Sequence, residues 1–140
     1  MIGMVLVTHG TLANALRDAM EHVVGKQKDV ATVCIESDAE FDSQRAEIAS
    51  RVAEVDSGDG VILLTDMFGG TPSNLAMSMA TQPGIEIIGG VNLPMLVKLA
   101  KIRGTQALAE AVQCAEAAGR KYICSGHEAQ PSVLPQRAAE

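Results

Sequence analysis

The chain has 140 residues, of which 47% are hydrophobic, 20% charged and only 2% aromatic. A single domain of this size buries roughly two thirds of its unfolded surface without needing a metal or a disulfide, and this composition excludes a disordered protein. The net charge of −6, with no basic run, argues against charge-driven binding of nucleic acid or of an anionic membrane.

The sequence contains no signal for secretion or membrane insertion. No apolar stretch approaches the roughly 20 residues that cross a bilayer, and the first residues lack the charged region of a signal peptide. We therefore expect a cytoplasmic protein. Cys34, Cys114 and Cys124 are widely spaced and form no ligand cluster, so we interpret them as small buried apolar residues.

Short β-branched runs alternate along the chain with longer segments of helical period. This alternation is typical of βαβ units on a parallel sheet. The predicted strands are nearly continuous in apolar residues, as strands covered by helices on both faces are. They span residues 2–7, 30–35, 61–65 and 85–90. The sequence therefore predicts a doubly wound α/β fold with a mostly parallel sheet and helices on both faces.

The first two predicted helices follow the first two strands. Residues 12–24 repeat apolar side chains at helical spacing with charged residues opposite, and Gly25 closes this helix. The run Ser37-Asp38-Ala39-Glu40 has the pattern of a capping box and predicts the start of the second helix. The side chains expected to face the core from that helix are Phe41, Ile48, Val52 and Val55.

Three further helices are predicted in the second half of the chain. Thr71 and Pro72 fit an N-cap followed by proline at the first helical position, and Pro94 marks a similar start. The last helix covers about residues 106–118 and ends at Gly119.

The end of the chain is expected to add one short edge strand and a tail. Lys121–Ser125 is the predicted strand. Beyond Gly126 the periodicity stops, and two prolines and scattered polar residues follow. We expect a domain of residues 1–125 and a flexible tail of residues 126–140.

Polar and glycine-rich loops follow three of the predicted strands. An open parallel sheet carries its functional site on such loops, at the carboxyl ends of its strands. The first loop is Thr8-His9-Gly10-Thr11, and the others span residues 66–74 and 89–92. We expect these loops to converge at one edge of the sheet.

His9 is the most informative single residue. A neutral imidazole has a lone pair for attack, so it can accept a phosphoryl group and release it again. Asp66 is the candidate carboxylate that would orient the opposite ring nitrogen. Taken singly, His9 also fits a core or capping histidine, and Asp66 also fits a residue that only caps a turn.

The loop after the third strand predicts an anion site. Gly69 and Gly70 allow close backbone approach, and the helix that begins at Pro72 directs its free N–H groups to the same place. The simpler interpretation is a flexible turn with a helix cap, and Phe68 fits an exposed docking residue as well as a buried one. The residues assigned to phosphate binding are Gly10, Thr11, Phe68, Gly69, Gly70, Thr71 and Ser73.

Other site motifs are missing from the sequence. The glycine loop lacks the Lys-Ser/Thr ending of a nucleotide P-loop, and the first loop lacks the spacing of a dinucleotide site. No metal-binding motif occurs, so no metal and no cofactor are predicted. His22 and His127 receive no role.

Three ordered motifs resemble a known family. VTHGTLA near the start, DMFGGTPSN after the third strand and GVNLPML after the fourth are similar to the enzyme IIA component of the mannose family in the bacterial phosphoenolpyruvate:sugar phosphotransferase system. The resemblance runs through most of residues 1 to about 125.

This resemblance implies a mechanism, two partners and a dimer. His9 matches the phosphorylated histidine, Asp66 the carboxylate that holds its ring, and Thr71 a position where the family more commonly has Ser. The implied donor is phospho-HPr and the family's acceptor is a IIB domain, so for this chain we expect the acceptor to be either a separate IIB protein or a regulatory target. The family forms homodimers that exchange a short antiparallel strand, to which Lys121–Ser125 corresponds.

Two alternatives remain open at this point. One is a regulatory interaction module, in which phosphorylation of His9 controls a partner without onward transfer. The other is a receiver-like domain that accepts phosphate on Asp66. The receiver alternative needs an acidic cluster after the first strand, where this chain has Thr8-His9-Gly10.

Overall fold

The computed structural model of the protein describes residues 1–36 and 40–129. Four strands form one parallel sheet in the order β2-β1-β3-β4. The strands are β1 (Gly3–His9), β2 (Val30–Ile35), β3 (Val61–Thr65) and β4 (Ile85–Gly89). The helices are α1 (Leu12–Val24), α2 (Phe41–Val55), α3 (Thr71–Met77), α4 (Leu93–Ile102) and α5 (Leu108–Lys121). The predicted α/β fold is confirmed.

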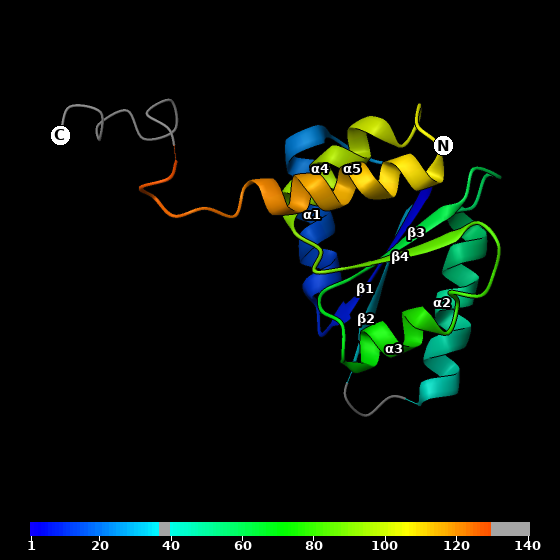
Figure 1. Cartoon of the computed structure of the whole chain (residues 1–140). Coiled ribbons are helices and arrows are strands. Elements are labelled where there is room, and N and C mark those ends of the chain that lie inside the picture. Colours follow the sequence, from blue (N-terminus) through cyan, green and yellow to red (C-terminus); the bar gives the residue numbers. More distant parts are fainter. Residues whose placement is uncertain (37–39, 130–140) are drawn as a thin grey trace.

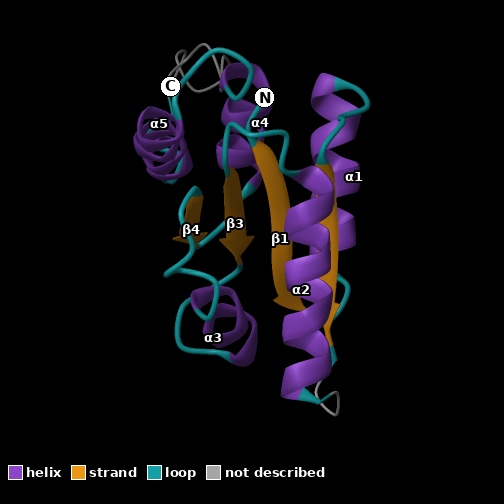
Figure 2. Cartoon of the chain, turned by 90° about the vertical axis from the view of Figure 1, so that its right-hand side faces the viewer, coloured by secondary structure: helices purple, strands orange, loops and turns teal. Residues whose placement is uncertain are grey.

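The helices divide between the two faces of the sheet, with α1, α4 and α5 on one side and α2 and α3 on the other (Figures 1 and 2). Alternate residues of β1 follow this division. Met4 and Leu6 join the core under the first group, whereas Val5 and Val7 join the core under the second. Because both faces are covered, the central strands are buried along their length and read as continuous apolar runs. No helix of the described residues is long and apolar enough to cross a membrane.

A buried arginine lies at the end of the sheet where β1 and β2 begin. Arg103 follows α4 and is only 1% exposed. Its guanidinium donates hydrogen bonds to the carbonyl oxygens of Ile2 at 3.1 Å and Asp29 at 3.2 Å, to the carbonyl oxygen of Lys28, and to Oε1 of Gln27 at 3.1 Å. Burial lowers the pKa of Arg103, and the charge of Asp29 partly offsets this effect. The side chain therefore ties the end of α4 to the starts of β1 and β2.

The prediction that Gly119 ends the last helix is wrong, because α5 continues to Lys121. Gly119 is buried between α5 and α4, and a Cβ atom there would lie 2.8 Å from Cε of Met95. Its carbonyl oxygen also accepts a hydrogen bond from the side chain of Asn92 at 2.9 Å. Glycine is needed here for close packing between helices and not for a helix stop.

The predicted strand at Lys121–Ser125 does not form in this chain. Lys121 is the last residue of α5, and the described residues after it contain no strand. After α5 this segment leaves the body of the molecule, and among the described residues it pairs with no strand (Figure 1). Tyr122 and Ile123 are 62% and 76% exposed as a result.

Three smaller expectations are also corrected. Phe41 does not face the core but is 47% exposed at the first position of α2. Cys124 is exposed, whereas Cys34 and Cys114 are partly buried. α3 begins one residue early, with Gly70 as its N-cap and Thr71 as its first residue.

Two expectations concern residues outside the described part. Ser37, Asp38 and Ala39 of the predicted capping box lie there, although Glu40 does precede α2 as expected. Residues 130–140 of the predicted tail also lie outside the described residues.

Candidate active site

The order of the strands creates a position where loops diverge at the carboxyl edge of the sheet. β1 lies between β2 and β3, and the chain leaves β1 toward one face through α1 and leaves β3 toward the other through α3. Ligand sites of open α/β sheets form where successive crossovers separate in this way. His9 is the last residue of β1, and Asp66 directly follows β3.

His9 and Asp66 are in direct contact at this edge. Nδ1 of His9 lies 2.8 Å from Oδ2 of Asp66, and the backbone N–H of His9 donates to the same oxygen at 3.0 Å. The His9 side chain is 52% exposed and that of Asp66 is 14% exposed. The carboxylate is thus shielded, while the imidazole reaches solvent.

The other oxygen of Asp66 is also engaged. Oδ1 accepts a hydrogen bond from the backbone N–H of Met67 at 3.0 Å and one from the hydroxyl of Thr65 at 3.4 Å. Burial raises the pKa of Asp66, but the hydrogen bonds and charge of His9, with the N–H of Met67, lower it below its ordinary value overall. Asp66 is therefore ionised at neutral pH.

An ionised carboxylate accepts hydrogen bonds and donates none, which determines the proton on the ring. Nδ1 of His9 must carry the proton that it shares with Asp66. The lone pair of the neutral ring is then on Nε2. This arrangement presents a nucleophilic nitrogen at the carboxyl edge of the sheet.

The glycine loop packs closely around this histidine. A Cβ atom at Gly70 would lie 3.0 Å from Nε2 of His9, so this glycine allows the loop to touch the ring. The ring of Phe68 occupies the place that a side chain on Gly89 would take, since a Cβ atom there would lie 2.4 Å from the ring of Phe68. The loop is therefore held against both β1 and β4.

The remaining predicted site residues lie around this pair in different roles. Gly10 has a φ of 53°, which lets the chain turn from β1 into α1, and Thr11 is the exposed N-cap of α1. Thr71 is exposed at the start of α3. Ser73 is 1% exposed, and its hydroxyl bonds the backbone of Gly69 and Gly70. The structure brings Asp66 and Gly70 directly against His9, whereas the Ser73 hydroxyl is held within the loop.

One residue that supports the site was missed in the sequence. Thr8 is buried, and its hydroxyl accepts the backbone N–H of Ala13 at 2.7 Å, which fixes the start of α1 beside His9. The available signal was a hydroxyl residue at a strand end, a few positions before a helix begins.

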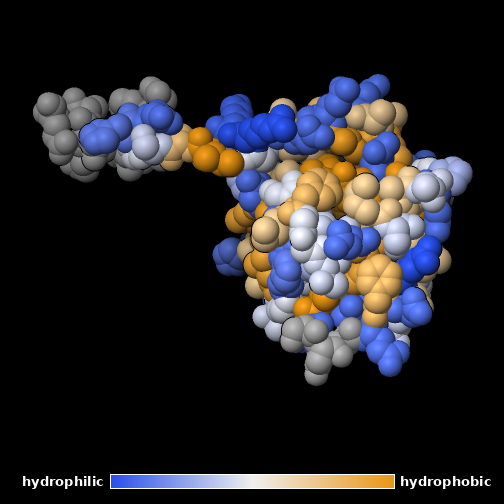
Figure 3. Space-filling model, turned by 60° about the horizontal axis from the view of Figure 1, so that its bottom comes forward, coloured by the Kyte–Doolittle hydropathy of each residue, from blue (hydrophilic) through white to orange (hydrophobic). Residues whose placement is uncertain are grey.

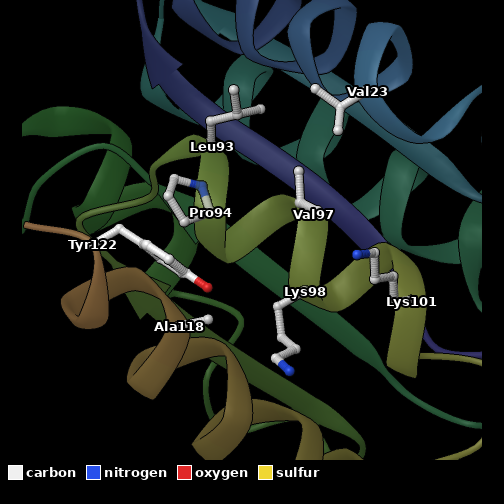
Figure 4. Close-up of a pocket in the computed structure, with 8 residues that line it drawn as sticks. All are labelled: Val23, Leu93, Pro94, Val97, Lys98, Lys101, Ala118 and Tyr122. Atoms are coloured by element: carbon white, nitrogen blue, oxygen red, sulfur yellow. The ribbon is translucent and has the colours of Figure 1, made fainter. Parts of the chain in front are cut away.

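The described residues offer other hollows and no metal cluster. A hollow of about 370 Å³ is lined by Val23 of α1, Val97 of α4 and Tyr122 (Figure 4). It contains none of the predicted site residues, and Lys98 and Lys101 are its only charged residues.

Within residues 1–36 and 40–129, no group of His, Cys, Asp and Glu side chains is arranged to hold a metal ion.

Comparison with known families gives a match over most of the chain. A family model described as "PTS system fructose IIA component" matches residues 3–116.

Individual proteins agree with this match. The PTS system mannose-specific EIIAB component of Escherichia coli K12 is 32% identical over 98 residues, which cover 69% of this chain and 30% of that protein. The chain thus spans less than a third of the length of this relative. The PTS system fructose-specific EIIA component of Bacillus subtilis is 25% identical over 130 residues, which cover 91% of this chain and 89% of that protein.

A solved structure shares the fold. The crystal structure of phosphotransferase system component EIIA from Streptococcus agalactiae has a TM-score of 0.83 at 21% identity and covers 92% of this chain and 100% of that chain. At this identity the likeness concerns the fold alone.

Proposed function

Because this chain belongs to the mannose-type enzyme IIA family of the phosphotransferase system, we propose that it is a cytoplasmic phosphohistidine carrier. In this proposal His9 accepts a phosphoryl group from phospho-HPr and passes it to a separate IIB-type protein. The observation that carries the proposal is the 2.8 Å contact between Nδ1 of His9 and Asp66, which leaves Nε2 with its lone pair at an exposed edge.

The transfer is a direct exchange between two imidazole rings. The lone pair of Nε2 attacks the phosphorus atom of phospho-HPr and forms a new N–P bond. The N–P bond of the donor breaks, and its electron pair returns to the donor nitrogen. Positive charge develops on the His9 ring, and the carboxylate of Asp66 stabilises it through the shared Nδ1 proton. The same steps in reverse deliver the group to the IIB acceptor.

Backbone N–H groups around the ring are the proposed ligands of the phosphoryl oxygens. They come from Gly70, Thr71 and Ser73 at the start of α3 and from Thr11 at the start of α1. The N–H groups of Gly69 and Gly10 already donate to Oγ of Ser73 and to the carbonyl oxygen of Ile35, so these two glycines contribute close approach to the anion instead of a donor. Helix starts leave N–H groups without partners inside the helix, so both segments offer donors to an anion. The Thr71 hydroxyl and the edge of Phe68 complete the proposed site.

The surface around His9 supports a protein as the partner. Leu12, Met67 and Phe68 are 43%, 57% and 55% exposed, respectively. Figure 3, which turns the lower end of the molecule in Figure 1 toward the viewer, shows apolar side chains among polar ones on this end. Apolar groups within a polar surface are typical of transient protein docking sites.

The test of this proposal is label transfer in a reconstituted mixture. The chain is incubated with phosphoenolpyruvate, enzyme I and HPr, and the modified peptide is identified by mass spectrometry. Phosphohistidine is labile to acid and stable to alkali, whereas an acyl phosphate on Asp66 is cleaved by hydroxylamine. Modification of the peptide containing His9, followed by passage of label to a IIB protein, is the expected result. Label that stays on His9 would favour a regulatory module instead.

We expect Asp66→Asn to slow phosphoryl acceptance by about 10- to 100-fold without abolishing it. The amide keeps a similar shape but removes the negative charge that stabilises the developing positive charge on His9. Rapid-quench measurement of label transfer from phospho-HPr gives the rate. Equal rates in wild type and variant would show that the carboxylate is not used.

A stability measurement on the same variant needs no phosphoryl donor. The pKa of Asp66 is lowered in the folded protein, so ionised Asp66 stabilises the fold above its ordinary pKa of 3.8. This contribution is lost as the pH falls through the lower folded-state pKa. The stabilisation that wild type gains over Asp66→Asn should be present at neutral pH and should be lost well below pH 3.8. A stabilisation that persists undiminished in such acid would contradict the assigned contact.

We further propose that the protein is a homodimer in which the segment after α5 pairs with the partner. β4 is an edge strand, and a hollow of about 390 Å³ beside it is lined by Ile87, Ile88 and Ile123, among others. Ile123 is 76% exposed in a single chain, and pairing with a second copy would cover it.

Ile123→Asp should convert the dimer into a monomer, because it places a charge on the side chain that the partner would cover. Sedimentation equilibrium measures the change from twice 14.6 kDa to 14.6 kDa. Met77→Asp is the matched control, since Met77 is an exposed apolar residue at the end of α3, on the other face of the sheet. A wild-type chain that sediments as a monomer would refute the dimer.

A further inference from the structure

The backbone of Gly70 packs against the edge of the His9 ring that carries Nε2. A Cβ atom at Gly70 would lie 2.9 Å from Cε1 and 3.0 Å from Nε2 of His9. Ordinary contacts between carbon atoms are about 3.5–4.0 Å, so any side chain here would move the ring. At Nδ1 the ring contacts Oδ2 of Asp66 at 2.8 Å. The imidazole is therefore held by a carboxylate at one nitrogen and by loop backbone next to the other.

The hydroxyl of Ser73 holds that part of the loop. Ser73 is 1% exposed, and its Oγ accepts the backbone N–H of Gly69 at 3.0 Å and donates to the carbonyl oxygen of Gly70 at 2.9 Å. The same carbonyl oxygen accepts the backbone N–H of Asn74 at 3.0 Å. Because one hydroxyl serves as both donor and acceptor, its removal would free the N–H of Gly69 and leave the Gly70 carbonyl with only the bond from Asn74.

We infer that Ser73 is a positioning residue for His9, which acts through Gly70 and does not touch the transferred group. The inference rests on the proposed function, because it concerns the nitrogen that takes the phosphoryl group. The hydroxyl proton of Ser73 is bound to the Gly70 carbonyl and the oxygen accepts from Gly69, so this group is already engaged within the loop. Its effect on transfer comes from where it holds the ring, since reaction rates depend steeply on the placement of reacting atoms.

The experiment compares Ser73→Ala with a matched control, Ser78→Ala, in the full chain. Ser78 also donates its hydroxyl to a carbonyl three residues earlier, Leu75, at 2.6 Å, but at the far end of α3. Histidine labelled with ¹⁵N reports the tautomer and mobility of each ring by NMR. We expect Ser73→Ala to shift and broaden the His9 ring signals of the unphosphorylated protein, with His22 and His127 as internal references. Transfer from phospho-HPr should slow about tenfold. Ser78→Ala should change neither quantity.

The ring signals separate this inference from its alternatives. If Ser73 bound the phosphoryl group directly, Ser73→Ala would slow transfer and leave the ring signals of the unphosphorylated protein unchanged, which overturns the inference. Unchanged transfer in Ser73→Ala would overturn it as well. If wild type accepts no label from phospho-HPr, the proposed function fails, while the ring signals still show whether Ser73 positions His9.

A second variant covers the case in which Ser73→Ala does not fold. Gly70→Ala keeps the Ser73 hydroxyl but adds a methyl group about 3 Å from the ring. It should displace the His9 signals and slow transfer at least as much as Ser73→Ala. Gly104→Ala is its control, because a Cβ atom at Gly104 meets nothing within 4 Å. Unshifted His9 signals in Gly70→Ala would overturn the inference.

Discussion

His9→Ala should reduce phosphoryl acceptance from phospho-HPr to background while the protein stays folded. The substitution removes Nε2, the nitrogen whose lone pair is free because Asp66 holds the Nδ1 proton. The His9 side chain is 52% exposed, so its loss should change the free energy of unfolding by about 1 kcal/mol or less. Label incorporation and urea denaturation measure the two effects separately.

The other two histidines provide matched controls for this variant. His22 and His127 are exposed, and neither lies among the residues assigned to the site. His22→Ala and His127→Ala should accept label at the wild-type rate. Retained labelling in His9→Ala would refute the assignment, and loss of labelling in either control would place the phosphorylated histidine elsewhere.

Arg103→Met should lower the free energy of unfolding by about 3 kcal/mol, the largest stability effect that we expect. Methionine fills much of the space but removes the guanidinium that donates to the carbonyl oxygens of Ile2, Lys28 and Asp29, of which the last still accepts the backbone N–H of Met4. For a domain of this length the loss corresponds to a fall in Tm of about 10 °C. Urea denaturation and thermal melting measure it.

An exposed arginine gives the matched control for Arg103→Met. The side chain of Arg120 is 81% exposed and lies 3.8 Å from the carboxylate of Glu116 on the same helix. Arg120→Met should therefore change the free energy of unfolding by no more than about 0.5 kcal/mol. Equal stability of the two variants would show that the buried hydrogen bonds of Arg103 contribute little.

His9→Ala and Arg103→Met act at opposite ends of the strands. β1 has seven residues, so its first residue lies roughly 20 Å from His9, its last. Arg103 binds next to the start of this strand. Arg103→Met should therefore still accept the phosphoryl group from phospho-HPr at a temperature low enough for it to be folded. His9→Ala should accept none and should keep its free energy of unfolding.

Local patterns in the sequence were sufficient to predict most of the fold. The apolar runs at Val30–Ile35 and Val61–Thr65 became strands with these bounds, because a strand buried on both faces needs apolar residues throughout. The amphipathic period of residues 12–24 gave α1 with these bounds. Parallel pairing then required the ends of β1 and β3 to share one edge, which is why His9 and Asp66 could be matched before their distance was known.

Elements at helix and strand ends were predicted less well. Phe41 fits the apolar period of α2, but in the first turn of the helix it stays exposed within the described part of the chain. Lys121–Ser125 reads as a strand, but strand formation requires hydrogen bonds to a partner strand, and within the described residues this segment pairs with none. In both cases the residue type favours burial or pairing, but the outcome depends on contacts that the local pattern does not determine.

The sequence by itself determined the class of fold and the end of the parallel strands at which His9 and Asp66 meet. Only the tertiary structure decided what Ser73, Gly119 and Arg103 do. The hydroxyl of Ser73 bonds the loop backbone, Gly119 lets α5 approach Met95, and Arg103 reaches carbonyl groups as far as Ile2, 101 positions away. Periodicity and turn signals report on neighbours along the chain, whereas these roles depend on which distant backbone atoms meet after folding.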